Sequence, residues 1–286
     1  MPVPGIPNLD LIVRSALKED RARQDVTTQR LVGASAISSA RIIVKEKGVV
    51  CGLVIVQRVF QALDRNLRCD LLCSEGKEVK KNAGVLVVKG KTRALLSGER
   101  TALNFLGYLS GIATNARRYV RAVYPYKVKI LDTRKTTPGL RELEKYAVRC
   151  GGAENHRFNL QDMILVKDNH RWACRRMTIA GMVNRLRKGR NKMMEFEVDT
   201  LPQLEQALEA GVDIILLDNM NCAQMKKAVA LRNKKEKNQR PLLEASGGIN
   251  LKNIRRIAQT GVERISVGAL THFRRAIDVS MEFMDE

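Results

Sequence analysis

The residues best suited to chemistry are basic ones gathered in a single stretch of the chain, Leu131–His170. Two strand-like runs lie in this stretch, and the basic side chains come at their ends and in the loops: Arg134, Lys135, His156, Arg157 and Lys167. An arginine guanidinium binds a carboxylate or phosphate through two parallel hydrogen bonds, and a lysine ammonium supplies a point charge. We therefore predict an enzyme whose substrate carries several negative charges.

Acidic residues accompany the next strands along the chain. Glu197 lies within one predicted strand, and Asp218 comes directly after the following one. Two carboxylates, with waters and substrate phosphates, are enough to hold Mg²⁺, and they also stabilise a positive charge that develops during a reaction. Glu195 and Asp199 alternate onto the same strand face as Glu197, but we interpret both as partners of nearby lysines, outside the site.

Two glycine-containing turns follow the last predicted strands. Ser246-Gly247-Gly248 begins a loop before a helix, and Gly268 precedes the final helix expected in the chain. Bare backbone N–H groups at such a position cradle a phosphate at the helix N-terminus. Both turns are therefore candidate phosphate sites.

Simpler structural roles stay open for individual residues. Arg134 can form an ion pair with Asp132, and His156 taken alone is better interpreted as a hydrogen-bonding anchor of its loop. A Gly-Gly pair occurs in many turns between helices and strands. The joint placement favours a site, because every strand predicted in this half of the chain ends in charged groups or glycine.

Strand and helix patterns alternate from about residue 128 onward, which is typical of a parallel sheet with helical connections. We predict strands at 128–131, 163–166, 194–198, 214–217, 242–245 and 264–267. A complete eight-stranded barrel needs two more, so the pattern leaves an incomplete barrel and an open sheet as alternatives. In both, the active site lies at the carboxyl ends of the strands.

Helix ends in this half are marked by capping residues. Thr200 and Gln203 form a capping-box pattern with proline in the first turn, and Gly211 closes that helix. Asn250 is predicted to open a helix that Gly261 closes.

The N-terminal half mixes short strands and helices. Ser97 is predicted to cap a helix that runs through Leu109, and a second helix is expected after Gly111. The remaining elements predicted here are strands 41–45, 69–73 and 85–89 and a helix at 54–63.

Size and composition suit a globular protein. The chain has 286 residues, of which 44% are hydrophobic, so it can bury the core of one large or two ordinary domains. The N-terminus lacks the features of a signal peptide, and no apolar run is long enough to span a bilayer, so we expect a cytoplasmic protein with no membrane partner. The cysteines show no CxxC spacing, and we expect reduced, mostly buried thiols: Cys51, Cys69, Cys73, Cys150, Cys174 and Cys222.

The net charge of +21 raises the alternative of nucleic-acid binding. Basic residues are spread along the chain, however, and aromatic residues make up only 4%, too few for a platform on which bases stack. A general attraction for anions is expected, and a dedicated nucleic-acid role is not.

The motifs together resemble those of quinolinate phosphoribosyltransferase, also called nicotinate-nucleotide pyrophosphorylase (carboxylating). The resemblance runs in uninterrupted order from about Leu17 to the C-terminus. It rests on Gly98-Glu-Arg-Thr-Ala-Leu-Asn104, Ser110-Gly-Ile-Ala-Thr114, Asp132-Thr-Arg-Lys-Thr-Thr-Pro-Gly139, Asn155-His-Arg157, Leu165-Val-Lys-Asp-Asn-His170, Glu197, Asp218 and Ser246-Gly-Gly-Ile249.

The resemblance implies an α/β fold in three parts. An N-terminal α/β sandwich domain is expected over 1–112 and an open, incomplete TIM-like α/β barrel of seven strands over 113–270. A C-terminal helix, within 271–286, is expected to pack back on the first domain. The barrel would thus have one strand more than the six predicted from the pattern.

The resemblance also implies an activity: quinolinate and phosphoribosyl pyrophosphate give nicotinate mononucleotide, pyrophosphate and carbon dioxide with Mg²⁺, in de novo NAD synthesis. By resemblance Glu197 and Asp218 hold the metal, directly or through water, and together with Lys135 form the catalytic group. Quinolinate is expected on Arg100, Arg134, His156, Arg157 and Lys167. The phosphoribosyl substrate is expected on Lys135, Ser246, Gly247, Gly248, Gly268 and His272.

Arg100 is implied to reach the active site of a neighbouring subunit, which makes a homodimer the minimal active unit; the sequence does not decide between a dimer and a hexamer. The chain departs from the family pattern at Gln24, Ala153 and Phe273, and none of these removes a charged site residue. The alternative functions are a related phosphoribosyltransferase acting on another carboxylated ring and a basic nucleic-acid-binding protein that reuses an enzyme fold.

Overall fold

The computed structural model describes residues 6–188, 192–236, 240–272 and 275–285, which form two compact units. Unit 1 comprises Met1–Arg117, Thr136–Gly152 and Leu270–Glu286, and unit 2 comprises Arg118–Lys135 and Ala153–Ala269. The expected division into consecutive segments placed 136–152 in the barrel domain, whereas this stretch belongs to unit 1. No helix in the described part of the chain is long and apolar enough to cross a membrane.

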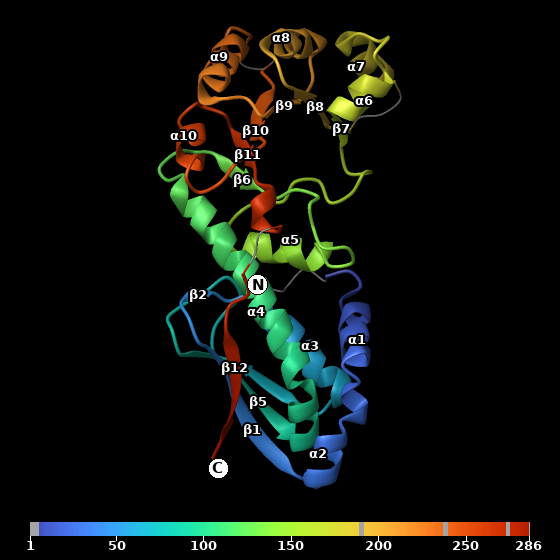
Figure 1. Ribbon diagram of the computed structural model, residues 1–286, viewed down its shortest axis with the longest axis vertical. Helices are drawn as coiled ribbons and strands as arrows, with labels where there is room; N and C mark the ends of the chain where they lie inside the picture. Colours follow the sequence, from blue (N-terminus) through green and yellow to red (C-terminus); the bar gives the residue numbers. More distant parts are fainter. Residues whose placement is uncertain (1–5, 189–191, 237–239, 273–274, 286) are drawn as a thin grey trace. The chain divides into compact units, whose positions relative to one another are not determined.

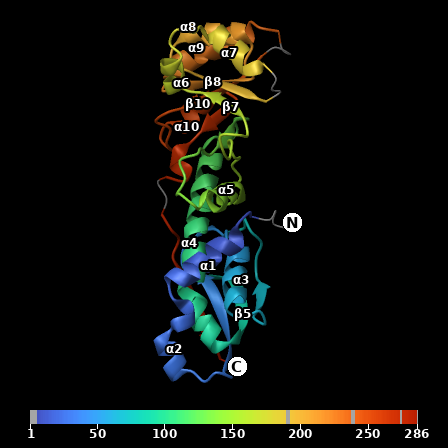
Figure 2. The same ribbon diagram turned by 90° about the vertical axis from the view of Figure 1, so that its right-hand side faces the viewer.

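Unit 1 contains a four-stranded antiparallel sheet with strand order β12-β1-β5-β3 and a small β2-β4 ribbon. Its helix α3 buries five apolar side chains, and α1 lies beside it (Figures 1 and 2). The strands are β1 (Ile37–Val44), β2 (Gly48–Val49), β3 (Arg68–Leu71), β4 (Glu78–Val79), β5 (Ala83–Lys91) and β12 (Val279–Met284). The helices are α1 (Leu9–Glu19), α2 (Val26–Leu31), α3 (Leu53–Leu63), α5 (Arg141–Cys150) and all but the last turn of α4 (Thr92–Ala122).

The prediction of two helices around Ser97 and Gly111 is wrong, because α4 is one continuous helix of 31 residues. Its glycines serve close packing and do not end it. A Cβ atom on Gly107 would lie 2.6 Å from the Ile277 carbonyl oxygen, and one on Gly111 would lie 2.1 Å from the Arg275 carbonyl oxygen. The Ile277 N–H also donates to the Gly107 carbonyl at 3.0 Å. These glycines therefore let an extended segment lie directly against the helix.

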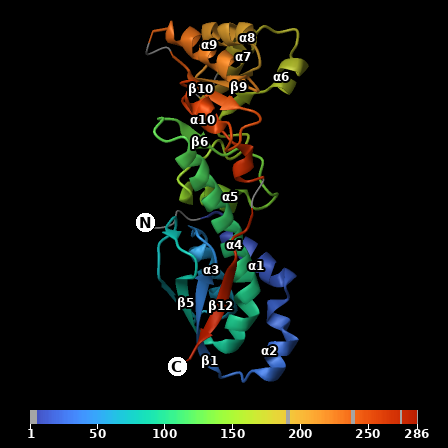
Figure 3. The same cartoon turned by 60° about the vertical axis from the view of Figure 1, so that its left-hand side comes forward.

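The predicted C-terminal helix within 271–286 is also wrong. Val279–Met284 forms the strand β12, which pairs antiparallel with β1 along its whole length, as Figure 3 shows. The segment does belong to unit 1, but it covers an edge of the sheet instead of packing as a helix. An unpaired edge of β1 would leave backbone donors and acceptors exposed, and β12 satisfies them. Phe273 lies outside the described residues.

Unit 2 contains a parallel sheet with strand order β6-β11-β10-β9-β8-β7. The strands are β6 (Lys129–Leu131), β7 (Ile164–Val166), β8 (Met194–Val198), β9 (Ile214–Asp218), β10 (Leu242–Ser246) and β11 (Arg264–Ser266). All six coincide with predicted strands. In place of the implied seventh strand, the described residues show one isolated parallel bridge between Glu154 and Leu131.

Helices α6 (Asp168–Ala173), α7 (Ile179–Arg187), α8 (Leu201–Ala210), α9 (Cys222–Asn233) and α10 (Ile254–Ala258) connect these strands. Thr200 caps α8 as predicted, by accepting a hydrogen bond from the Gln203 N–H, and Gly211 ends it with a φ of 72°. The helix predicted from Asn250 begins later, at Ile254, because residues 251–253 form a turn.

Candidate functional site

The carboxyl ends of the parallel strands bring three of the predicted site residues to the same edge of the sheet. β8 and β9 pair with Glu197 opposite Leu216, and β9 and β10 pair with Asp218 opposite Ser246. These three strands lie side by side in Figure 1. Because the strands are parallel, the loops that follow them begin at one edge, which is where ligands bind in such sheets.

Two guanidinium groups lie close together near this edge. Arg157 is 9% exposed and donates to the Met163 carbonyl oxygen at 3.2 Å. Burial lowers the pKa of Arg157, and the neighbouring charge of Arg134 lowers it further. Arg134 is half-buried, and two like charges that are partly withdrawn from water repel each other unless an anion neutralises them. The pair is therefore suited to bind a ligand with more than one carboxylate.

Asp132 fixes the loop that carries Arg157. Its carboxylate is fully buried and accepts hydrogen bonds from the His156 N–H at 2.9 Å and the Asn155 side-chain amide at 2.6 Å. The Asp132 N–H in turn donates to the Glu154 carbonyl oxygen. The DTRK and NHR motifs are thus one structural unit: the first motif holds the second in place.

His156 lies between this loop and two buried carboxylates inside the sheet. Its Nε2 atom is 3.0 Å from Glu195 and 3.3 Å from Glu244, and both glutamates are fully buried. Glu244 also receives a hydrogen bond of 2.6 Å from Arg264, which stands directly opposite it on β11. The interpretation that Glu195 pairs with a lysine is therefore wrong. Asp199 pairs with Arg171 at 3.2 Å.

Two opposing effects decide the protonation state of His156. Burial alone would lower the pKa of His156, but the hydrogen bonds and charges of Glu195 and Glu244 outweigh it and raise that pKa to about 9. The Nδ1 atom of His156, however, accepts the Arg157 N–H at 2.8 Å, which requires a lone pair and so favours the neutral ring. In both states Nε2 carries a hydrogen toward the carboxylates. Both ring nitrogens face protein groups, which is the geometry of a loop anchor.

The pKa values of the two glutamates shift in opposite directions, although both groups are buried. Burial, reinforced by the charge of Glu244, raises the pKa of Glu195. Burial also acts on Glu244, but the hydrogen bonds from His156 and Arg264 outweigh it, and the pKa of Glu244 is lowered. Glu244 is accordingly the ionised member of the network.

Glu197 and Asp218 lie beside a lysine at the strand ends. Glu197 is 6% exposed, lies 3.4 Å from the Lys167 ammonium and accepts the Asp168 N–H at 3.0 Å. Burial raises the pKa of Asp218, and so does the charge of Glu197. Asp218 accepts a hydrogen bond of 2.7 Å from the Asn219 amide. The two carboxylates are thus near enough to act on one ligand.

The first of the two predicted phosphate turns has a backbone that favours glycine. Gly247 has a φ of 91°, and a Cβ atom there would lie 2.1 Å from the Asn219 side-chain oxygen. Gly248 also has a positive φ, 61°. A Cβ atom on Gly268 would lie 3.1 Å from the Lys135 side chain, so this turn and Lys135 are neighbours. The structure thus brings Asn219 against the first turn and Lys135 against the second.

Unit 2 therefore holds eleven of the thirteen predicted site residues: Arg134, Lys135, His156, Arg157, Lys167, Glu197, Asp218, Ser246, Gly247, Gly248 and Gly268. Arg100 and His272 belong to unit 1, so their part in the site stays a prediction. Two residues of the network, Glu244 and Arg264, were not predicted. The signal that marks them is a charged residue inside an otherwise apolar predicted strand, which also marks Glu195.

Known proteins of one family are similar to this protein over nearly its whole chain. Residues 25–110 match the family model of the quinolinate phosphoribosyl transferase N-terminal domain, and residues 112–282 match that of its C-terminal domain. A probable nicotinate-nucleotide pyrophosphorylase [carboxylating] from Synechocystis is 42% identical over 96% of this chain and 92% of its own length. One from Bacillus subtilis is 41% identical over 92% of this chain and 89% of its own.

Solved structures are equally similar. The crystal structure of NadC from Streptococcus pyogenes superimposes with a TM-score of 0.93 at 37% identity and covers 100% of both chains. The nicotinate-nucleotide pyrophosphorylase from Francisella tularensis gives a TM-score of 0.90 at 39% identity, over 99% of this chain and 98% of that one.

Proposed function

Since this chain belongs to the quinolinate phosphoribosyltransferase family, we propose that the strand ends of unit 2 form its catalytic site. The reaction transfers the phosphoribosyl group of phosphoribosyl pyrophosphate to quinolinate with loss of one carboxylate. It yields nicotinate mononucleotide, pyrophosphate and carbon dioxide, and it supplies NAD biosynthesis. The assignment of individual residues below is our proposal.

The observation that carries the residue assignment is the pair formed by the half-buried Arg134 and the buried Arg157. Quinolinate has two adjacent carboxylates, and two neighbouring guanidinium groups match that charge. Lys167 adds a further positive charge at the same edge. His156 is assigned to the quinolinate site through its support of the Arg157 backbone, since both of its ring nitrogens face protein groups.

The phosphoribosyl substrate is assigned to the neighbouring strand ends. Its pyrophosphate is assigned to Lys135, and its 5′-phosphate to the Ser246–Gly248 and Gly268 turns together with His272. The carboxylates of Glu197 and Asp218 would face the ribose carbon from which pyrophosphate leaves. Negative charge there stabilises the oxocarbenium-like ribose that develops as that bond breaks.

Mg²⁺ fits the donor set of Glu197 and Asp218. Among the described residues, groups of three potential protein ligands occur elsewhere and include neither of these carboxylates. Two carboxylates without a third protein ligand are typical of Mg²⁺, which keeps waters and substrate phosphates as its other ligands. When bound, the ion would neutralise charge on the pyrophosphate. Zinc, which favours three or four nitrogen and sulfur ligands, does not fit.

The remaining chemistry follows from positioning. The arginine pair would orient quinolinate so that its ring nitrogen faces the ribose carbon, and attack by that nitrogen displaces pyrophosphate. The ribosylated nitrogen is positively charged. It stabilises the carbanion left at the adjacent carbon when its carboxylate departs as carbon dioxide. This sequence needs no covalent enzyme intermediate.

We further propose a cytoplasmic homodimer, or a hexamer built from dimers, in which Arg100 completes the quinolinate site of the neighbouring subunit. The strongly basic composition is consistent with anionic substrates and does not require nucleic acid. A monocarboxylate ring in place of quinolinate would bring one negative charge fewer to Arg134, Arg157 and Lys167, which disfavours the alternative substrate.

The test is to mix the protein with quinolinate, phosphoribosyl pyrophosphate and Mg²⁺ and to follow nicotinate mononucleotide and carbon dioxide together. We expect both products in equal amounts and their loss when the metal is chelated. Glu197→Gln is expected to lower turnover strongly while quinolinate binding, measured by calorimetry, is retained. Turnover with nicotinate but not with quinolinate would contradict the dicarboxylate site.

A further inference from the structure

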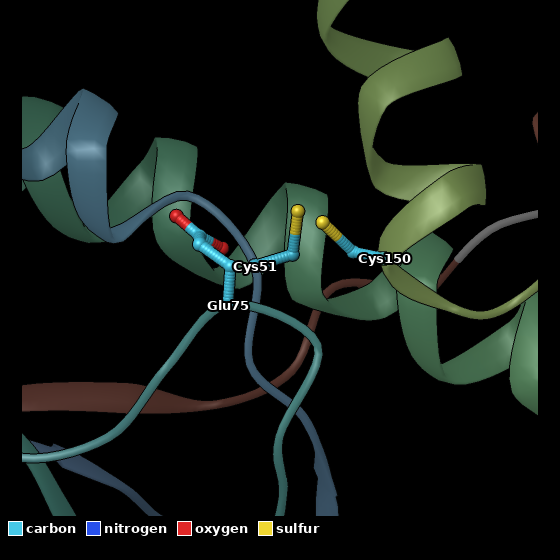
Figure 4. Close-up of side chains that lie close together, drawn as sticks. All are labelled: Cys51, Glu75 and Cys150. Atoms are coloured by element: carbon cyan, nitrogen blue, oxygen red, sulfur yellow. The ribbon is translucent and has the colours of Figure 1, made fainter. Parts of the chain in front are cut away.

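A pair of cysteines lies in unit 1, outside the residues assigned to the reaction. Cys51 directly precedes Gly52, the N-cap residue of α3, and Cys150 is the last residue of α5. The two sulfur atoms and a carboxylate oxygen of Glu75 all lie within 4.8 Å of one another. Figure 4 shows the two sulfurs directed toward each other. The chain thus brings together two thiols that are far apart in sequence.

The two thiols have unequal surroundings. Cys51 is the one fully buried cysteine of the described chain, and burial raises its pKa, so it stays protonated. Cys150 is partly exposed, and its pKa is lowered because the Cys51 thiol and the Tyr146 hydroxyl donate hydrogen bonds to it. A partly exposed thiol with a lowered pKa beside a second thiol is the arrangement found in cysteines that react with peroxides.

The backbone on both sides of the pair is held by hydrogen bonds. The hydroxyl of Ser110 accepts the Cys51 N–H at 2.9 Å and donates to the Cys51 carbonyl oxygen at 3.1 Å. Arg117 donates to the carbonyl oxygens of Cys150, at 3.3 Å, and Gly151, at 2.7 Å. With both main chains fixed, the sulfurs stay next to each other, and each is the nearest partner for a reaction of the other.

Glu75 has a structural role that sets it apart from the thiols. Its two oxygens accept the N–H groups of Gly52, at 2.8 Å, and Val54, at 3.3 Å, at the start of α3. Burial raises the pKa of Glu75. Both oxygens serve the helix end, which disfavours Glu75 as the third ligand of a metal, and its raised pKa makes the carboxylate a better proton acceptor for Cys51 than an ordinary glutamate.

We propose that Cys51 and Cys150 are a modification site at which a hydroperoxide forms a reversible disulfide. The Cys150 thiolate attacks the peroxide, takes one oxygen as sulfenic acid and releases water or an alcohol. The Cys51 sulfur then attacks the Cys150 sulfur, its proton passes by way of Glu75 to the departing hydroxide, and water leaves. Two thiols are oxidised to one disulfide while one peroxide is reduced. A dithiol reductant reverses the step by thiol exchange.

The cross-link would join the start of α3 to the end of α5. The residues after Cys150 lead through Gly151 and Gly152 to the loop of His156 and Arg157. The modification therefore acts on the segment that precedes the proposed quinolinate ligands, and it does not require the assignments made for those ligands to hold.

The test treats the full-length, fully reduced protein with hydrogen peroxide, blocks remaining thiols and maps peptides by mass spectrometry. We expect one cross-linked peptide pair, Cys51 with Cys150, lighter by two hydrogen atoms and restored by dithiothreitol. The exposed Cys174 serves as the internal measure of peroxide dose. Failure of the cross-link at doses that oxidise Cys174 would overturn the proposal.

Variants of Cys51 separate disulfide formation from the initial oxidation of Cys150. In Cys51→Ala and Cys51→Ser, Cys150 is expected to proceed to sulfinic acid because no neighbouring thiol traps the sulfenic acid. Cys69→Ser is the matched control and should cross-link like the unaltered chain. Circular dichroism checks that each variant is folded, and the cross-link in the unaltered chain needs no variant at all. A zinc ion retained in equimolar amount and released by loss of Cys51 would also overturn the proposal.

Discussion

The two larger sheets of the described structure place their strand ends differently, and the parallel one gathers charged groups. In the parallel sheet of unit 2 every strand ends at the same edge, so side chains from β8, β9 and β10 meet there. In the antiparallel sheet of unit 1 neighbouring strands end at opposite edges. Parallel topology thus collects residues from distant parts of the sequence, whereas the antiparallel sheet mainly buries an apolar face.

The two units also differ in what they bury. Unit 2 encloses His156, Glu195 and Glu244 inside its sheet, and ionised groups are costly to remove from water unless they are paired. Unit 1 buries neutral groups next to α3 and within α4, such as the Cys51 thiol and the Ser110 hydroxyl, and its fully buried charged residues, Glu144 and Lys145, lie on the helix α5 and not at strand ends. Substitutions at the strand ends of unit 2 should therefore change activity, and those of buried groups in unit 1 should change stability alone.

The largest effect is expected for Arg134→Ala, which removes one member of the arginine pair. Removing a charged group that pairs with a ligand carboxylate away from bulk water costs several kcal/mol, so kcat/KM for quinolinate should fall by about 1000-fold or more with the fold intact. Arg93→Ala is the matched control in unit 1, where Arg93 donates to the carbonyl oxygens of Val32 and Gln29. Steady-state kinetics measure both, and unchanged turnover of Arg134→Ala would refute its assignment.

A strong effect on stability is expected for Glu244→Leu. It leaves Arg264 and His156 without their ionised partner, and uncompensated buried charge costs about 3 kcal/mol or more of the free energy of unfolding. Urea denaturation of the whole chain measures the loss. The control is Glu154→Gln, whose partner Lys129 is exposed, for which at most about 1 kcal/mol is expected. Equal losses of the free energy of unfolding in the two variants would show that Arg264 and His156 do not depend on the Glu244 carboxylate.

Gly247→Ala is expected to act mainly on the phosphoribosyl substrate. The added Cβ meets the Asn219 side chain in a turn with positive φ, so the turn must shift. KM for phosphoribosyl pyrophosphate should rise about tenfold, which corresponds to about 1.4 kcal/mol. Gly211→Ala is the control, because Gly211 has a similar φ of 72° but a Cβ atom added there would meet no neighbouring heavy atom within 4 Å. If KM also rose in Gly211→Ala, the rise in Gly247→Ala would not be due to the contact of its Cβ with Asn219.

The smallest effect is expected in unit 1, for Ser110→Ala. The substitution removes the hydroxyl that satisfies the N–H and the carbonyl of Cys51, at a cost of about 1 to 2 kcal/mol in the free energy of unfolding. Thermal unfolding measures this cost. Turnover per folded molecule should stay unchanged, and a fall in turnover would show that the two units do not divide stability and activity in this way.

Local sequence patterns were sufficient for the strands of unit 2 and for several of its caps. All six strands were predicted, because buried parallel strands are short apolar runs between amphipathic helices. The Thr200 cap and the Gly211 terminus depend on residues within one helix, so they too were predictable. The same pattern predicted that the charged groups lie together, since the carboxyl ends of parallel strands lie at one edge of the sheet.

Long-range contacts decided the rest. α4 continues past Gly107 and Gly111 because an extended segment more than 150 positions later lies against those glycines, which no local window contains. The same holds for β12, which forms a strand because β1 offers it a partner.

The sequence by itself therefore determined which residue types stand at the strand ends, and with them the family and its reaction. Only the tertiary structure decided how buried groups pair: His156 with Glu195 and Glu244, and Cys51 with Cys150. The physical reason is that periodicity and capping are properties of neighbouring residues. Pairing of buried groups instead depends on which distant segments share a core, and a single sequence does not specify those distances.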